Sequence, residues 1–153
     1  MAVEPRFEIL GELGRGGMAT VYLANDRHSE QQVALKVLHA HLADRPSTQR
    51  RLDRELEAAR RVVHPAIVHP FERVEHDGRP ALVLPAMSGQ TLRDHVETEG
   101  PLTEDALRGL LTEIGGALCA AHGAGVLHRD VTPNNVLWDD GQPRLVDFGL
   151  ARL

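Results

Sequence analysis

A cluster of glycines between two strand-like stretches constrains the fold of this 153-residue chain more than any other feature. Residues 14–19 read GRGGMA and match the pattern G-x-G-x-x-(G/A), in which backbone N–H groups can close on a phosphate. A dinucleotide-binding turn with the same pattern must open a helix. The residues that follow, 20–23, are Thr, Val, Tyr and Leu, which favour a strand. The cluster therefore predicts a hairpin that either cradles phosphate or is a plain turn.

The first half of the chain is predicted to be rich in strands. Alternating or continuous apolar stretches that suit strands occupy residues 7–13, 20–24, 32–38, 71–75 and 81–84. The last two flank Asp77-Gly78, which predicts a hairpin turn. One amphipathic helix is predicted over residues 47–63, after Pro46. Its expected buried face consists of Leu52, Leu56, Ala59 and Val63.

The second half is predicted to be mainly helical. A short helix is expected over residues 91–97, and a long one from a Thr103 cap to Gly123. The expected buried face of the long helix consists of Leu107, Leu110, Leu111, Ile114, Leu118 and Ala121, with Cys119 buried as well. A polar loop over 128–135 then leads to two short strands, 136–138 and 144–146, around a turn at 139–141. The fold class is therefore α+β, with a boundary near residues 85–89.

Composition narrows the possible functions. The net charge of −5 argues against general nucleic-acid binding. No apolar run approaches the roughly 18 residues that span a membrane. The nine histidines lack partners at metal-ligand spacing. Cys119 is the only cysteine, which excludes an intrachain disulfide and fits a cytoplasmic location.

The basic residues of this chain are almost all arginines. Lys36 is the only lysine among 17 basic residues, and it lies in the apolar run Val-Ala-Leu-Lys over residues 33–36. The lysine side chain carries a compact ammonium charge at the end of a flexible chain, whereas the arginine guanidinium is planar and has several donors. The two therefore bind a phosphate differently. Lys36 is therefore a candidate phosphate contact.

Two polar motifs in the second half could support phosphoryl chemistry. Residues 128–135 read HRDVTPNN, in which Asp130 could accept a proton and the Asn135 amide oxygen could bind Mg²⁺. Asp147-Phe148-Gly149 supplies a second carboxylate for Mg²⁺, an apolar plug and a flexible pivot. The strand–turn–strand between the motifs predicts that Asn135 and Asp147 return close to one another.

The order of these motifs resembles the eukaryotic-like protein kinase family. The resemblance runs from about Phe7 to Leu153, and residues 64–68 (HPAIV) and 92–94 (LRD) are similar to bacterial serine/threonine kinases. It implies that residues 1–153 form a partial kinase domain. Residues 7–86 would be an antiparallel β-sheet N-lobe with one helix, and residues 87–153 an incomplete, mostly helical C-lobe that ends shortly after Asp147-Phe148-Gly149.

The resemblance also implies roles for individual residues. Lys36 would hold the ATP phosphates and pair with Glu55, with Glu57 as the alternative partner. Asp130 would be the catalytic base, and Asn135 and Asp147 would bind Mg²⁺ or Mn²⁺. The phosphate-covering loop would consist of Leu13, Gly14, Arg15, Gly16, Gly17 and Met18. The adenine site would consist of Val21, Ala34, Leu84, Pro85, Met87 and Leu137.

Three positions depart from the family pattern. Ala19 replaces the third glycine, Pro70 stands where a larger apolar residue is usual, and Thr132 stands where serine/threonine kinases usually carry a lysine. Thr132 can donate a hydrogen bond to the transferring phosphate but carries no charge. We therefore expect a role in catalysis for Thr132 that is weaker than that of a lysine.

The resemblance implies transfer of phosphate from MgATP to a serine or threonine of a protein substrate, with further domains possible in the parent protein. Residues 150–153 alone follow the Asp147-Phe148-Gly149 motif, so the usual substrate platform is absent and we expect weak or no transfer by this piece alone. Two alternatives are a non-catalytic nucleotide-binding or scaffold module and a small-molecule phosphotransferase of related fold.

Overall fold

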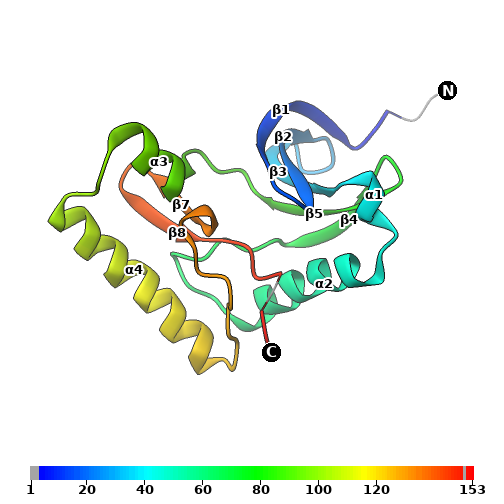
Figure 1. The fold of residues 1–153 in the computed structure, drawn as a ribbon. Coiled ribbons are helices and arrows are strands. Elements are labelled where there is room, and N and C mark those ends of the chain that lie inside the picture. Colours follow the sequence, from blue (N-terminus) through cyan, green and yellow to red (C-terminus); the bar gives the residue numbers. More distant parts are fainter. Residues whose placement is uncertain (1–3, 150) are drawn as a thin grey trace. The chain divides into compact units, whose positions relative to one another are not determined.

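The computed structural model describes residues 4–149 and 151–153 (Figure 1). The chain divides into two compact units. The first contains the described residues up to Leu52 together with Pro70–Met87, and the second contains Asp53–His69 and the described part of 88–153.

The first unit is built on a five-stranded antiparallel sheet. Its strands are β1 (Phe7–Arg15), β2 (Ala19–Asp26), β3 (Gln31–Leu38), β4 (Glu72–His76) and β5 (Arg79–Pro85). They lie in the order β1-β2-β3-β5-β4, so β1 and β4 are the edges. The strands predicted from the sequence are confirmed. Asp77 and Gly78 have positive φ angles of 49° and 72°, as a tight hairpin turn requires.

The two edge strands of this sheet meet at one end. The Arg6 guanidinium, just before β1, donates to both Asp26 oxygens at 2.9 Å and to both Glu72 oxygens at 2.8 Å. The Phe7 and His76 rings, also on β1 and β4, have centroids 6.2 Å apart. The sheet must therefore curl, since its edges could not otherwise touch. One face of the curl holds a core that consists of Phe7, Ala24, Val33, Leu35, Val37, Ala81 and Val83.

Two helices follow β3. The four-residue helix α1 (Ala40–Ala43) was not predicted, because one turn is too short to show a period. Helix α2 (Pro46–Arg61) begins at Pro46, close to the expected start.

The buried face of α2 differs from the prediction. Leu52, Glu55 and Ala58 are buried on the helix, and Val62 is buried just after its end, whereas Val63 is 90% exposed. Leu52 was predicted correctly, but beyond it the predicted face was wrong by about one residue. The helix ends at Arg61, and packing selects the stripe next to the one that periodicity suggested.

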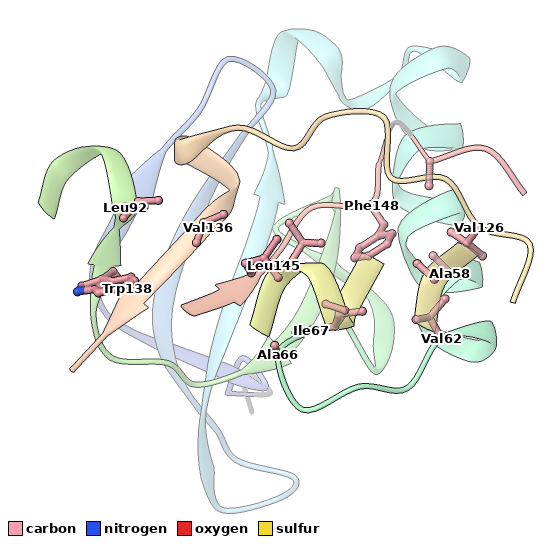
Figure 2. Close-up of a cluster of buried hydrophobic side chains, with 14 residues drawn as sticks. Ala58, Val62, Ala66, Ile67, Leu92, Val126, Val136, Trp138, Leu145 and Phe148 are labelled. Atoms are coloured by element: carbon pink, nitrogen blue, oxygen red, sulfur yellow. The ribbon is translucent and has the colours of Figure 1, made fainter. Parts of the chain in front are cut away.

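The second unit combines two helices with a small sheet. Thr91 and Thr103 accept backbone hydrogen bonds that cap α3 (Leu92–Glu99) and α4 (Glu104–Gly123). Strands β6 (Gln90–Thr91), β7 (Val136–Asp139) and β8 (Gln142–Leu145) pair in that order, and a 3₁₀ turn η1 (Pro133–Asn135) precedes β7. β6 was not predicted. Figure 2 shows the core of this unit, into which Trp138, Leu145 and Phe148 project.

The buried face of α4 differs from the prediction as well. Ile114, Ala117 and Ala121 are buried, while Leu107 and Leu111 are 44% and 64% exposed. Ile114 and Ala121 were predicted correctly, and Leu110 and Leu118 are partly buried against the core, so the prediction was wrong at Leu107 and Leu111. The helix carries apolar residues on adjacent stripes, and only packing selects which stripe is buried.

Cys119 was predicted to be buried on α4, and it is exposed. It follows Ile114 by five residues and so lies about 140° around the helix from that buried side chain. Among the described residues, no helix is both long and apolar enough to cross a membrane.

Candidate active site

The polar loop before β7 is organised by the His128 ring, which is 1% exposed. Its Nδ1 accepts a hydrogen bond from the Asp130 backbone N–H at 3.1 Å. Its Nε2 lies 2.9 Å from the Val146 carbonyl oxygen. Because Nδ1 is an acceptor, the ring is neutral with its proton on Nε2, which donates to Val146. One tautomer therefore satisfies both contacts.

Asn135 holds the Asp130 side chain. The Asn135 Nδ2 group donates to the Asp130 carboxylate at 2.9 Å and to the Asp130 backbone carbonyl at 3.0 Å. Both partners are acceptors, so the amide nitrogen must face them and the amide oxygen must face away. The loop is closed behind this contact by the Asn135 N–H, which donates to the Thr132 carbonyl at 2.9 Å.

The β7–β8 hairpin returns the chain to Asn135. The Val146 N–H donates to the Asn135 carbonyl at 2.9 Å, which sets Asp147 one residue from this contact. His128, Asp130, Asn135 and Val146 thus form a closed ring of hydrogen bonds. Neither His128 nor Val146 was predicted as a site residue. The His-x-Asp spacing could have indicated the first, whereas Val146 acts through its backbone and leaves no sequence signal.

Two residues of this region have left-handed backbone angles without being glycine: φ is 69° at Arg129 and 63° at Asp147. Such angles cost of order 1–3 kcal/mol and persist only where surrounding contacts hold them. Arg129 lies between the hydrogen-bonded residues His128 and Asp130. Asp147 is held by its own Oδ1, which accepts from the Gly149 N–H at 3.1 Å. Both strained residues therefore flank or belong to the candidate site.

Three other predicted site residues lie in the second unit. Thr132 and Leu137 are half-buried, and Leu137 pairs with Arg144 and Thr91 in the small sheet. Glu55 lies on α2 with 2% of its surface exposed. A buried carboxylate is costly unless it is paired or hydrogen-bonded, and Glu55 does have a partner.

Glu57, the alternative to Glu55, has a different environment. Its side chain is 48% exposed and accepts a hydrogen bond from Arg61, one turn further along α2, at 2.7 Å. Of the two glutamates, Glu55 is therefore the one that is buried.

Four predicted residues of the first unit lie on one face of its sheet. Lys36 is 9% exposed in the central strand β3, opposite Val21 on β2. Ala34 is opposite Leu84 on β5. Directly paired residues share a face, and so do residues two apart. Val21, Ala34, Lys36 and Leu84 therefore lie on the face opposite the apolar core. Lys36 too has a partner.

The glycine cluster forms the turn between β1 and β2. The Gly16 N–H donates to the Ala19 carbonyl at 2.9 Å. A Cβ atom added at Gly14 or Gly17 would meet no atom within 4 Å. The backbone of this turn is thus open to a ligand.

The side chains around this turn are mostly exposed. Leu13 is 49% exposed, and Met18 is half-buried. The exposed Arg15 pairs with Glu12, which lowers the pKa of that carboxyl. At the other end of the predicted nucleotide site, Pro85 ends β5 and is followed two residues later by the half-buried Met87.

Comparison with known proteins shows which family the chain belongs to. Residues 7–153 match the protein kinase domain family. A probable serine/threonine-protein kinase of Streptomyces coelicolor is 40% identical over 152 residues, which cover 96% of this chain and 23% of the relative. PknB of Mycobacterium tuberculosis is 39% identical over 152 residues, covering 96% and 24%. PrkC of Bacillus subtilis is 35% identical over 150 residues, covering 97% and 23%.

The chain belongs to the protein kinase family and is a catalytic-domain sequence of the bacterial serine/threonine type. The family and the α+β fold class predicted from the sequence are confirmed. The chain spans about a quarter of the length of the relatives named above.

Proposed function

We propose that this chain provides the nucleotide-binding and phosphoryl-transfer groups of a protein serine/threonine kinase, which transfers the γ-phosphate of MgATP to a hydroxyl of a protein substrate. The ring of hydrogen bonds through His128, Asp130, Asn135 and Val146 is the observation that carries this proposal. It holds a carboxylate beside an amide and sets a second carboxylate, Asp147, next in the chain.

The donor set suits a divalent cation such as Mg²⁺ or Mn²⁺. The Asn135 amide nitrogen faces Asp130, which leaves the amide oxygen directed elsewhere. Oxygen ligands of this kind, together with the Asp147 carboxylate, are those that Mg²⁺ prefers. Asn135 and Asp147 would therefore hold the metal, and MgATP would supply the phosphoryl group and the charge that offsets its negative oxygens.

In this proposal the Asp130 carboxylate accepts the proton of the attacking substrate hydroxyl. The Asn135 hydrogen bond to the Asp130 carboxylate keeps that side chain from turning, and the second bond, to the Asp130 backbone carbonyl, holds the Asn135 amide in place. The carboxylate would therefore act as an oriented base. Thr132 would donate a hydrogen bond to the transferring phosphate. A hydroxyl gives less charge stabilisation than an ammonium group, so we expect slower transfer than a lysine at position 132 would allow.

The first unit would bind the nucleotide. Lys36 would contact the phosphates, and the open backbone of residues 13–18 would cover them. The apolar surface for the base would consist of Val21, Ala34 and Leu84, and the Pro85 carbonyl and the Met87 N–H would meet its edge. The family resemblance adds Leu137, a residue of the second unit. We also propose that Lys36 pairs with Glu55, that the substrate is a protein and that the chain acts in the cytoplasm.

Nucleotide binding tests the proposal directly. At a MgATP concentration of about 100 times Kd, binding should stabilise the chain by about 2.7 kcal/mol, measured as a rise in Tm. Lys36→Met and Asp147→Asn should each reduce that rise. Arg108→Met is the matched control, since Arg108 is exposed and pairs with its helix neighbour Glu104 on α4.

A wild-type Tm that does not change when MgATP is added would contradict the proposal. So would a rise that Lys36→Met leaves unchanged. Transfer of radiolabelled phosphate to a generic basic protein should be lost on Asp130→Asn, and labelling that survives this substitution would place the catalytic base elsewhere.

A further inference from the structure

The Phe148 ring, which is fully buried, lies between two histidines. The His128 ring meets it edge-on with centroids 4.5 Å apart, and the His69 ring is tilted by 47° with centroids 5.0 Å apart. Figure 2 shows Phe148 inside the apolar cluster of the second unit. The position of Phe148 therefore depends on two imidazoles as well as on aliphatic neighbours.

The two histidines differ in their hydrogen bonds. Both His128 nitrogens are engaged, one by the Asp130 N–H and the other by the Val146 carbonyl. In contrast, both His69 nitrogens are buried without a hydrogen-bond partner, and no other side-chain atom in the described part of the chain shares that condition. An unpaired buried polar group costs about 1–3 kcal/mol, and a charged one costs more.

The surroundings of His69 disfavour its protonated form. Burial is the larger influence and lowers its pKa, while the nearby Val62 carbonyl acts in the opposite direction. No charged side chain contributes to the shift, Glu55 on the preceding helix included. The other titratable ring against Phe148 is His128, whose Nδ1 accepts a hydrogen bond.

We propose that His69 is a positioning residue for Phe148, and through it for Asp147, and that it holds Phe148 in place only as a neutral imidazole. A proton on His69 places a charge at a buried site where the Val62 carbonyl, and no charged group, favours it, so protonation should draw the ring toward solvent and away from Phe148. Acidification would therefore loosen Phe148. The link from Phe148 to metal binding at Asp147 rests on the proposed function.

The chain contains three phenylalanines, Phe7, Phe71 and Phe148, so fluorophenylalanine labelling gives three ¹⁹F resonances. Phe7→Leu and Phe71→Leu assign them. Between about pH 8 and about pH 5 the Phe148 resonance should shift or broaden, with the midpoint at which His69 titrates in a ring-nitrogen NMR titration. That midpoint should lie below the usual pKa of His. A Phe148 resonance that ignores pH, or a His69 midpoint at or above the usual value, would overturn the proposal.

His69→Leu removes the titratable imidazole and leaves an apolar side chain against Phe148. In a variant whose Tm shows that it folds, the pH response of Phe148 should vanish; if it persists, His128 or another group causes it and the proposal fails. His122→Leu, at an exposed histidine on α4, should leave the response intact. In the wild type, the midpoint of the Phe148 response can be compared with the midpoint of the His69 titration. This comparison tests the proposal even if His69→Leu does not fold.

MgATP binding separates this inference from the proposed function. The wild-type Kd for MgATP should rise severalfold from about pH 7.5 to about pH 5.5, and His69→Leu should remove that change. If Phe148 responds through His69 but MgATP does not bind at any pH, the proposed function fails and the positioning role stands. If MgATP binds at the higher pH and Phe148 is indifferent to pH, the positioning role fails alone.

Discussion

Single residues with positive φ mark the places where the backbone turns most sharply. Asp77 and Asp140 each precede a glycine in a hairpin turn, where both central residues need left-handed angles. Arg129 and Asp147 have no such turn to account for them and are held by hydrogen bonds across one residue. In the hairpins the local sequence is sufficient for the turn, whereas at the candidate site the surrounding ring maintains the strain.

Gly89 provides a test at this scale. Its φ is 104°, and a Cβ there would lie 2.8 Å from the Trp138 carbonyl oxygen. Gly89→Ala should therefore destabilise the fold by at least about 1–3 kcal/mol, measured by chemical denaturation. Gly141→Ala is the matched control, because φ is 76° but nothing lies within 4 Å. Equal losses for the two variants would contradict a clash at Gly89.

At the scale of elements, the ion-pair cluster of Arg6, Asp26 and Glu72 joins the two edges of the sheet in the first unit. Asp26 is 2% exposed, and the Arg6 hydrogen bond lowers its pKa to about 2, helped by the His28 N–H and opposed by burial. The same guanidinium lowers the pKa of Glu72. The stability of this sheet should therefore depend on pH, because the cluster needs both carboxylates in their charged form.

Asp26→Asn should expose that dependence. The folded pKa lies below the unfolded value of 3.8, so the contribution is fully present above about pH 4 and is lost as the pH falls towards about 2. Near neutral pH the variant should be about 2 kcal/mol less stable than wild type, and the gap should close in acid. Asp44→Asn, at an exposed position, should show no such convergence. Parallel stability curves for Asp26→Asn and wild type would contradict this assignment.

The buried stripe of α4 can be tested with two substitutions on one helix. Ile114 is 7% exposed, so Ile114→Ala should cost about 2–5 kcal/mol. Leu111 is 64% exposed, so Leu111→Ala should change stability by no more than about 0.5 kcal/mol. Denaturant unfolding of both variants gives the comparison. A large loss at Leu111 would contradict its exposed position on the helix.

At the scale of the whole molecule, the two units each hold one buried charge of the pair predicted from the sequence, Lys36 in one and Glu55 in the other. If the two side chains interact, Lys36→Met and Glu55→Gln should not be additive. A double-mutant cycle on stability should give a coupling of about 0.5–3 kcal/mol. The cycle Lys36→Met with Glu97→Gln is the control, because Glu97 pairs with Arg93. Additive losses for Lys36 and Glu55 would show that they act independently.

Much of the fold was predictable because local patterns sufficed. Alternation located the strands other than β6, and Gly turns located the hairpins at Asp77-Gly78 and Asp140-Gly141. Thr91 and Thr103 marked the starts of α3 and α4. The four-residue α1 and two-residue β6 could not be found, since neither is long enough to show a period. The buried faces of α2 and α4 were only partly predicted: Leu52, Ile114 and Ala121 are buried as expected, but other positions were wrong. Adjacent apolar stripes of a helix differ little in sequence, and the residues that cover them lie far away along the chain.

The sequence by itself determined the family, the order of the motifs and the residue types available for phosphate, metal and proton chemistry, because these depend on spacing along the chain. Only the tertiary structure decided how His128 and Val146 close the ring around Asp130, that β1 and β4 meet through Arg6, and that His69 lies against Phe148. Those contacts join residues 18, 66 and 79 positions apart, and backbone groups and packing partners leave no pattern in the local sequence.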